Sequence, residues 1–163
     1  IDSYAKYNYA DNTWDIGSLA RTAWVDFGLH SKPRAAGVAD SLNYIYSHET
    51  GTTDDGSAME PFIESSVFSI GDGEQFSFIS RLIPDIDITS SDANTTVNYV
   101  LKSRNFPGES LSTNSTSAVT STTDQAFVRS RSRSSVLRVE SSASDIQWTL
   151  GDLRLDIRPD GRR

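Results

Sequence analysis

No apolar stripe with helical spacing persists over three turns anywhere in this chain. Apolar residues come instead in short runs, several of them alternating with polar residues, and turn residues separate the runs at intervals of roughly ten residues. Strands that cover a core with one face produce this pattern. The sequence therefore predicts an all-β fold, namely an antiparallel β-sandwich with a short N-terminal β extension.

The clearest strand signals lie in the second half of the chain. Residues 85–89, 146–150 and 153–157 alternate apolar and polar side chains with period two. The segment Gly71-Asp72-Gly73 separates two apolar runs and indicates a hairpin turn. Residues 109–124 contain ten Ser or Thr in sixteen positions, a composition that predicts an exposed loop.

A domain boundary is predicted near residues 47–61, which are polar and rich in turn residues. Residues 1–60 are then an N-terminal β segment and connector, with a loop over 28–43, and residues 61–163 are a sandwich of five or six strands. A chain of 163 residues suits one domain, or one domain with a fragment of a neighbour. Because it opens on Ile1 instead of Met, we expect it to be a cut-out, a processed product or the ordered part of something longer.

Composition excludes several classes of site. The chain has no cysteine, which excludes disulfides, thiolate metal sites and a cysteine nucleophile. No apolar stretch approaches the ~20 residues that a membrane-spanning helix needs. The net charge of −7 argues against tight DNA binding, although charge is unevenly spread: residues 1–64 carry −6, residues 65–124 carry −4 and residues 125–163 carry +3.

The densest polar cluster contains His48, Glu49, Asp54 and Asp55. Carboxylates with a histidine are ligands for a divalent cation, which makes these residues weak metal candidates. Their spacing matches no known metal motif, and Asp-Asp-Gly is also typical of an ordinary turn. With no nucleophile motif around a Ser and no diagnostic context for either histidine, the sequence predicts no catalytic residue and no cofactor.

Arg129, Arg131 and Arg133 alternate with serines, so a strand would place all three on one face. Three guanidinium groups ~7 Å apart repel one another unless the face meets carboxylates or phosphates. Two interpretations remain open: a contact with another subunit or with nucleic acid, and a solvated outer sheet face. If the face is a contact, protein carboxylates are the favoured partner because the rest of the chain is acidic.

Three segments resemble the tail nozzle, or packaged-DNA stabilisation, proteins of short-tailed bacteriophages. Residues 7–14 and 17–24 read YNYADNTW and GSLARTAW, and are similar to the family's aromatic and Arg-x-Ala-Trp stretches. Residues 44–56 contain YIYSHETG and DDG, similar to the family's HE-x-G-x-x-DDG stretch. Residues 148–163, WTLGDLRLDIRPDGRR, resemble its C-terminal part.

The resemblance implies a virion structural protein and no enzyme. It implies a hexameric ring built from a β-propeller and a β-sandwich platform, so residues 1–60 are expected to be the exit from a propeller. The implied partners are adaptor or portal-side tail proteins, a tail fibre or needle, and genomic DNA that passes without sequence-specific binding. The family's motif residues, among them Arg21 and Trp148, are expected to have structural roles. Trp14 and Trp24 are expected as packing anchors, Gly51 and Gly56 in turns, and Arg154 with Asp156 as an ion pair or interface.

Two other classes of function stay open. A carbohydrate- or receptor-binding module would use Trp24, Tyr44 and Tyr46 as a stacking platform, and these side chains would then be exposed together on one patch. A glycan-cleaving enzyme would need two carboxyl groups that face each other ~5–10 Å apart across a cleft. Burial of the aromatic residues in a core would favour the structural interpretation.

Overall fold

The computed structural model describes residues 3–26, 28–39, 41–92 and 95–162, and all of their regular secondary structure is β-strand. The all-β prediction is confirmed. Every strand pairing is antiparallel, and the chain divides into two units, Ile1–Gly51 and Thr52–Arg163. The boundary thus falls before the predicted end of the N-terminal segment at residue 60. Within the described residues, no helix is long and apolar enough to cross a membrane.

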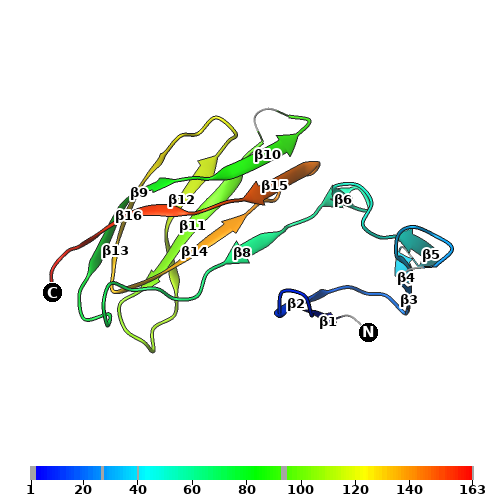
Figure 1. Ribbon diagram of the computed structural model, residues 1–163, viewed down its shortest axis with the longest axis horizontal. Coiled ribbons are helices and arrows are strands. Elements are labelled where there is room, and N and C mark those ends of the chain that lie inside the picture. The colour runs from blue at the N-terminus through cyan, green and yellow to red at the C-terminus, as the bar shows by residue number, and fades with distance from the viewer. Residues whose placement is uncertain (1–2, 27, 40, 93–94, 163) are drawn as a thin grey trace. The chain divides into compact units, whose positions relative to one another are not determined.

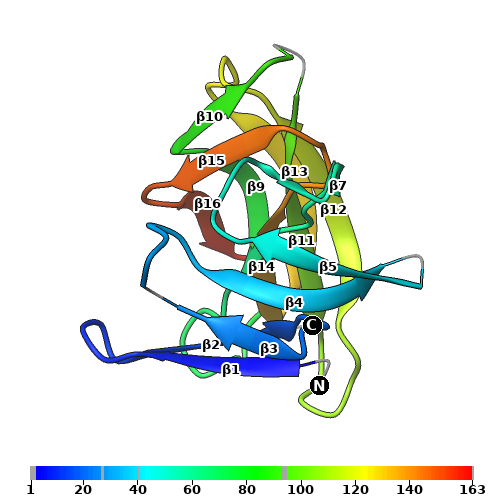
Figure 2. The same ribbon diagram turned by 90° about the vertical axis from the view of Figure 1, so that its right-hand side faces the viewer.

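Unit 1 consists of a hairpin and a three-stranded sheet (Figure 2). Asn12, with φ 54°, lies in the turn between the hairpin strands, where Asp11-Asn12 was expected to turn. The strands of unit 1 are β1 (Ser3–Asn8), β2 (Thr13–Ser18), β3 (Ala23–Val25), β4 (Arg34–Ala39) and β5 (Leu42–Ser47).

The predicted loop over residues 28–43 is wrong, because β4 lies inside it as the central strand of the β3–β4–β5 sheet. The strand RAAGVA is built mostly of small residues and shows little alternation in hydropathy. Its Gly37 is needed for close packing: a Cβ there would meet the side chains of Arg21 and Tyr46 at 3.1 Å. Small residues are therefore selected here by the large side chains that lie over them.

Unit 1 buries little apolar surface of its own. Among its described residues, Ala35 is the single member of the buried hydrophobic core, whereas Tyr9, Ile16 and Leu29 are 86%, 81% and 100% exposed. Monomeric soluble domains rarely expose so many large apolar side chains together. Unit 1 therefore leaves most of its large apolar side chains in contact with solvent.

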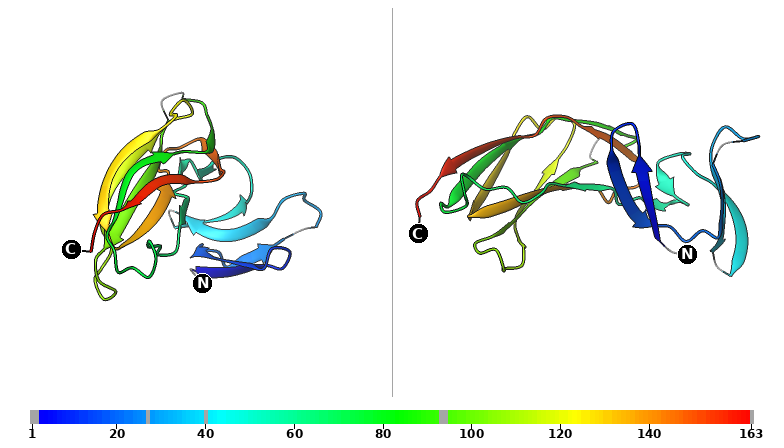
Figure 3. Two further views of the ribbon diagram at one scale, coloured as in Figure 1. Left: turned by 60° about the vertical axis from the view of Figure 1, so that its left-hand side comes forward. Right: turned by 60° about the horizontal axis from the view of Figure 1, so that its bottom comes forward.

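Unit 2 contains a four-stranded sheet, β12–β11–β14–β8, and a three-stranded sheet, β13–β9–β16, with the pair β10–β15 continuing the second sheet (Figures 1 and 3). Buried residues from both sheets form one core, as in a sandwich. The strands are β6 (Thr53–Asp54), β7 (Ser57–Ala58), β8 (Phe62–Glu64), β9 (Ser77–Ile83), β10 (Ile86–Ser90), β11 (Val97–Arg104), β12 (Ser112–Val119), β13 (Ala126–Ser132), β14 (Ser134–Glu140), β15 (Ile146–Leu150) and β16 (Arg154–Pro159).

Strand β11 is the centre of this core. Val97, Tyr99 and Leu101 are each at most 1% exposed, and the strand pairs with β12 on one side and β14 on the other. Alternate positions of β9 and β14 supply Ile79 and Val139 to the same cluster. The period-two pattern in the sequence is thus the pattern of inward-facing residues in the sandwich.

Two loop predictions in unit 2 need correction. Residues 109–124 contain strand β12, which lies at the edge of the four-stranded sheet and buries only Val119 fully. An edge strand with one solvated face tolerates Ser and Thr, so their composition did not exclude a strand. Gly71 and Gly73 turn the chain with φ 58° and 78°, but this turn joins β8 in one sheet to β9 in the other and closes no hairpin. Because β8 and β12 are strands that the sequence did not predict, the two sheets contain more strands than the five or six expected.

Strand β9 continues into β10 and β15 continues into β16, and both connections bend at the same place, at Asp85 and Gly151. On one side of the bend β9 pairs with β16, and on the other side β10 pairs with β15. The Gly151 N–H donates to the Asp85 carbonyl at 2.8 Å, and the Asp152 N–H donates to the Asp85 carboxylate at 3.2 Å. A Cβ on Gly151 would lie 2.7 Å from that carboxyl group, so a larger residue there would displace the Asp85 side chain. This bend connects two halves of one continuous ribbon.

On the outside of the four-stranded sheet, Glu64 is at the centre of an ion-pair network. Its carboxylate lies 2.6 Å from Lys102 Nζ and 3.4 Å from Arg138, which also pairs with Glu140 at 2.5 Å. The hydrogen bond from Lys102 holds the pKa of Glu64 below its usual value, against the opposing effect of burial. The network ties β8 to β11 and β14.

Glu64→Gln is expected to lower the free energy of unfolding by about 0.5–1 kcal/mol at about pH 7. Because the folded-state pKa lies below the unfolded value, the contribution of Glu64 is present above the unfolded pKa and is lost as the pH falls through the folded pKa. Urea unfolding should therefore separate the variant from the wild type at neutral pH and not in acid. Glu60→Gln, at an exposed residue of the same unit, is the control; an equal effect of both would contradict the network's role.

The hydroxyl of Tyr99 is buried and has no hydrogen-bond partner among the described residues. Burial, with the negative charge of Asp85 as a smaller cause, raises the pKa of Tyr99 to about 12. Tyr99→Phe is expected to leave stability unchanged or raise it by up to about 1 kcal/mol, because it removes an unpaired polar group. Tyr99→Ala should cost about 3–5 kcal/mol, because it opens a cavity. Chemical denaturation measures both, and a marked loss in Tyr99→Phe would reveal a partner for the hydroxyl.

Candidate functional site

The motif residues of the N-terminal half meet on one face of the β3–β4–β5 sheet. The guanidinium carbon of Arg21 lies 3.9 Å from the ring centre of Tyr46, and Arg21 Nε donates to His48 Nε2 at 3.4 Å. The ring of His48 lies 4.8 Å from that of Trp24. These four side chains, which we call the motif cluster, come from segments about 25 residues apart in the sequence.

Backbone hydrogen bonds hold the motif cluster in place. The Thr22 N–H donates to the Ala36 carbonyl at 3.0 Å, and the His48 N–H donates to the Pro33 carbonyl at 2.9 Å. Arg21 also donates to the carbonyl of Ala20 at 2.9 Å. The cluster therefore fastens the segment before β3 and the end of β5 to the central strand.

The aromatic residues of this face remain accessible. Tyr44 lies 6.1 Å from Tyr46 between ring centres, and register places Trp24 and Tyr46 opposite the same residue, Ala35. Trp24 is 48% exposed and Tyr44 is 44% exposed. Trp24 and Tyr44 are thus exposed on one face together with Tyr46, which is half-buried because Arg21 lies over its ring.

Two expected packing anchors are not buried within unit 1. Trp14 is 71% exposed and has one aromatic neighbour, Tyr7, at 4.7 Å between ring centres, directly opposite in the hairpin. Trp24 is 48% exposed, and its ring lies 4.8 Å from that of His48. The physical reason is that unit 1 has no second layer to enclose them. Trp148 differs: it packs against the core of unit 2 and donates from Nε1 to Ser141 Oγ at 3.0 Å.

The weak metal candidates are placed as parts of turns and of the motif cluster. His48 Nε2 already accepts a hydrogen bond from Arg21, and Glu49 follows it with φ 57°. Asp54 pairs with Ser57 in the β6–β7 hairpin, whose turn is Asp55-Gly56 with φ 50° and 85°. Within the described residues, no three His, Cys, Asp or Glu side chains converge as a metal site would require.

Both glycines of the HE-x-G-x-x-DDG stretch have a positive φ angle. Gly51, with φ 75°, and Gly56, with φ 85°, both adopt the left-handed conformation that glycine favours. Two consecutive positive φ angles at Asp55 and Gly56 are typical of a type I′ hairpin turn. The Asp-Asp-Gly segment is therefore a structural turn.

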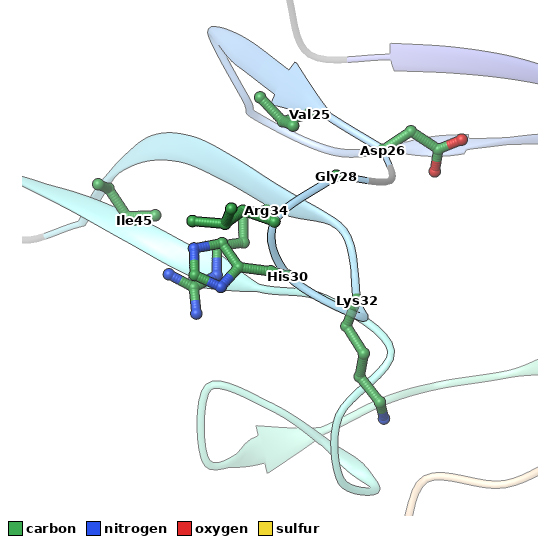
Figure 4. Close-up of a pocket in the computed structure, with 8 residues that line it drawn as sticks. Val25, Asp26, Gly28, His30, Lys32, Arg34 and Ile45 are labelled. Atoms are coloured by element: carbon green, nitrogen blue, oxygen red, sulfur yellow. The ribbon is translucent and has the colours of Figure 1, made fainter.

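Unit 1 also contains an open pocket of about 320 Å³, lined by Val25, Asp26, Gly28, Leu29, His30, Lys32, Arg34 and Ile45. Figure 4 shows the His30 ring beside the Arg34 side chain, whereas the Asp26 carboxylate and the Lys32 amine point away from them. Lys32 donates to the carbonyl of Glu49. A pocket with one carboxylate that points outward does not supply the facing carboxyl pair of a glycan-cleaving site.

In unit 2, the serine–arginine alternation is explained by the two faces of β13. Ser130 and Ser132 are each 1% exposed; they bond to Asn114 at 3.1 Å and to Ser135 at 2.9 Å. Arg129 and Arg131 occupy the outer face, as the alternation predicted. Small hydroxyl residues are suited to the inner face because neighbouring polar groups satisfy them there.

The three arginines of this segment have different surroundings. Arg131 pairs with Asp160 at 2.5 Å and lies 4.1 Å from the ring of Phe76. Arg133 follows the end of β13 and donates to the carbonyls of Glu74 and Arg162 at 2.7 and 3.1 Å. Arg129 is exposed and forms no hydrogen bond or ion pair with the described residues. Arg133 therefore holds neighbouring backbone segments, Arg131 is ion-paired, and Arg129 is open to a partner from outside the chain.

The expected pairing of Arg154 with Asp156 is wrong. The two residues share the outer face of β16, but Asp156 pairs with Arg81 of β9 at 2.5 Å. Register explains the choice, since Asp156 lies directly opposite Arg81. Sequence reasoning missed Arg81 because no local pattern marks a residue whose partner lies 75 positions away.

Comparisons with known proteins add no family assignment: no protein-family model matches the chain, and no curated protein matches it.

Arg21→Ala is expected to loosen the segment before β3, because it removes the side chain that stacks on Tyr46 and bonds to His48. The measurement is amide hydrogen exchange at Thr22, which should accelerate about fivefold if about 1 kcal/mol of local stability is lost. Arg34→Ala, at an exposed arginine outside the cluster, should leave that amide unchanged. Equal rates in both variants would contradict the cluster's role.

Proposed function

We propose that this chain is a structural subunit of a bacteriophage tail, a nozzle or hub ring that continues the DNA channel below the portal and adaptor. In that role it retains packaged DNA and supports its ejection, without enzymatic activity. The observation that carries the proposal is the motif cluster: Arg21, Trp24 and His48 come from two separate stretches that resemble nozzle proteins, and they pack on one another. Motif residues that hold segments together are what a structural protein requires.

The exposed apolar surface of unit 1 also supports an assembled state. Residues such as Tyr9, Ile16 and Leu29 are almost fully exposed in the single chain, and an assembly would cover them. The proposed partners are further copies in a hexameric ring, adaptor or portal-side tail proteins, and a tail fibre or needle. The net charge of −7 suits a channel through which DNA passes without being held.

A second candidate is a carbohydrate- or receptor-binding module of a phage tail. Exposure of Trp24 and Tyr44 on one patch with Tyr46 favours it, because sugars stack on aromatic faces that are open to solvent. This patch overlaps the motif cluster, so a binding role and a structural role are separable only by experiment.

The test is the molar mass of the full chain by light scattering after size exclusion, with electron microscopy of the same sample and a glycan array. The proposal expects closed rings of hexamer mass and no glycan signal. A monomer or trimer with a glycan signal contradicts it and supports the second candidate. In that case Tyr44→Ala should abolish the signal, whereas Tyr9→Ala, on the hairpin, should not.

A further inference from the structure

The charges of unit 2 are divided along a single ribbon. Strands β9 and β16 pair with each other, and across the bend they continue as β10 and β15, which also pair (Figure 1). The half formed by β9 and β16, together with β13, has an outer face with five arginines, which we call the arginine face: Arg81, Arg129, Arg131, Arg154 and Arg158. The half formed by β10 and β15 carries carboxylates.

Cross-strand register arranges the arginine face in rows. Arg131 and Arg158 lie on either side of Phe78, and Arg158 is 4.9 Å from its ring centre. In the next row, Phe127 and Asp156 lie on either side of Arg81. Phe127 is 76% exposed, so the face combines cations with an accessible aromatic ring. Aromatic and arginine side chains together are typical of the centre of a protein interface.

The arginine face carries more arginines than carboxylates that could neutralise them. Asp156 and Asp160 pair with Arg81 and Arg131, which leaves three of the five arginines in excess. Arg129, Arg154 and Arg158 form no ion pair with any described residue. All three are exposed, so a partner's carboxylates can reach them.

The other half of the ribbon, which we call the acidic half, is complementary. Asp85, Asp87, Asp145 and Asp152 are all exposed there, and none forms an ion pair with a described residue. Residues 84–92 and 141–153, which contain the acidic half and its turns, include no Lys or Arg. One unit therefore presents a surface rich in cations and a surface rich in carboxylates.

We propose that the arginine face binds the acidic half of a second copy of this chain. The inference deepens the ring proposed above and rests on it, since it names the surfaces that join neighbouring copies. Guanidinium groups bind carboxylates with two parallel hydrogen bonds, which gives such a contact orientation as well as attraction. Phe127 supplies the apolar contact that charge alone lacks.

A second copy fits the arginine face better than a nucleic acid does. Asp156 and Asp160 lie among the arginines and would repel phosphates. The remaining chain is strongly acidic, so a polyanion would be repelled at long range. The acidic half offers four exposed carboxylates to the three arginines that have no ion pair on the arginine face, so the same molecule supplies both sides of such a contact.

The test is charge reversal followed by mixing. One variant combines Arg129→Glu with Arg158→Glu, and the other combines Asp87→Lys with Asp152→Lys; all four side chains are exposed and free of hydrogen bonds to the described residues. Sedimentation velocity should show wild-type chains associating at low ionic strength and dissociating in about 1 M salt, where charges are screened beyond about 3 Å. Each variant alone should associate about tenfold or more weakly.

Mixing the two variants should restore association, because reversed acids then meet reversed arginines and each intact surface meets its intact partner. A control that combines Lys6→Glu with Arg34→Glu makes the same change in net charge as the arginine reversal, but in unit 1, and should behave as the wild type. Wild-type association that survives both reversals overturns this contact and leaves the ring intact. A salt-sensitive dimer without rings supports the contact and counts against the ring. Wild-type chains that stay monomeric, or that bind a single-stranded oligonucleotide through the arginine face, overturn the contact.

Discussion

The structure of unit 2 depends on the burial of strand β11 between two neighbours and beneath a second sheet. Val97, Tyr99 and Leu101 are almost inaccessible to water, and Ile79, Leu82 and Val128 of the facing sheet belong to the same core cluster. Burial of such side chains is the main favourable contribution to folding. Because side chains alternate between faces, fixing the inner face also fixes which residues face outward.

The outward-facing positions of unit 2 carry the charged side chains through which we propose that it binds a second copy of the chain. On β13 the inner serines are satisfied by neighbouring polar groups, and this leaves the arginines between them on the outer face. The bend at Asp85 and Gly151 then separates an arginine-rich part of the ribbon from a carboxylate-rich part. Core packing and surface charge are thus two consequences of one strand register.

Unit 1 follows a different principle. It has cross-strand pairing and the motif cluster, yet its large aromatic residues stay exposed because a single sheet with a hairpin encloses no core. Arg21 covers Tyr46 and bonds to His48, so these motif residues hold the sheet in shape while leaving Trp24 and Tyr44 accessible. A unit built in this way fits a chain whose stability is completed by association, which is the role that we propose for it.

The all-β class, most strands of unit 2 and the turns at Asn12 and Asp55-Gly56 can be predicted from the amino-acid sequence, because alternation and turn chemistry act between residues that are close along the chain. Tertiary packing makes residues 34–39 a central strand and 112–119 an edge strand, since small or hydroxyl residues acquire their place from what packs on them. It alone decided that Arg81 is the partner of Asp156, and that Arg21 reaches His48. Such pairs depend on register between distant strands, which no local pattern specifies.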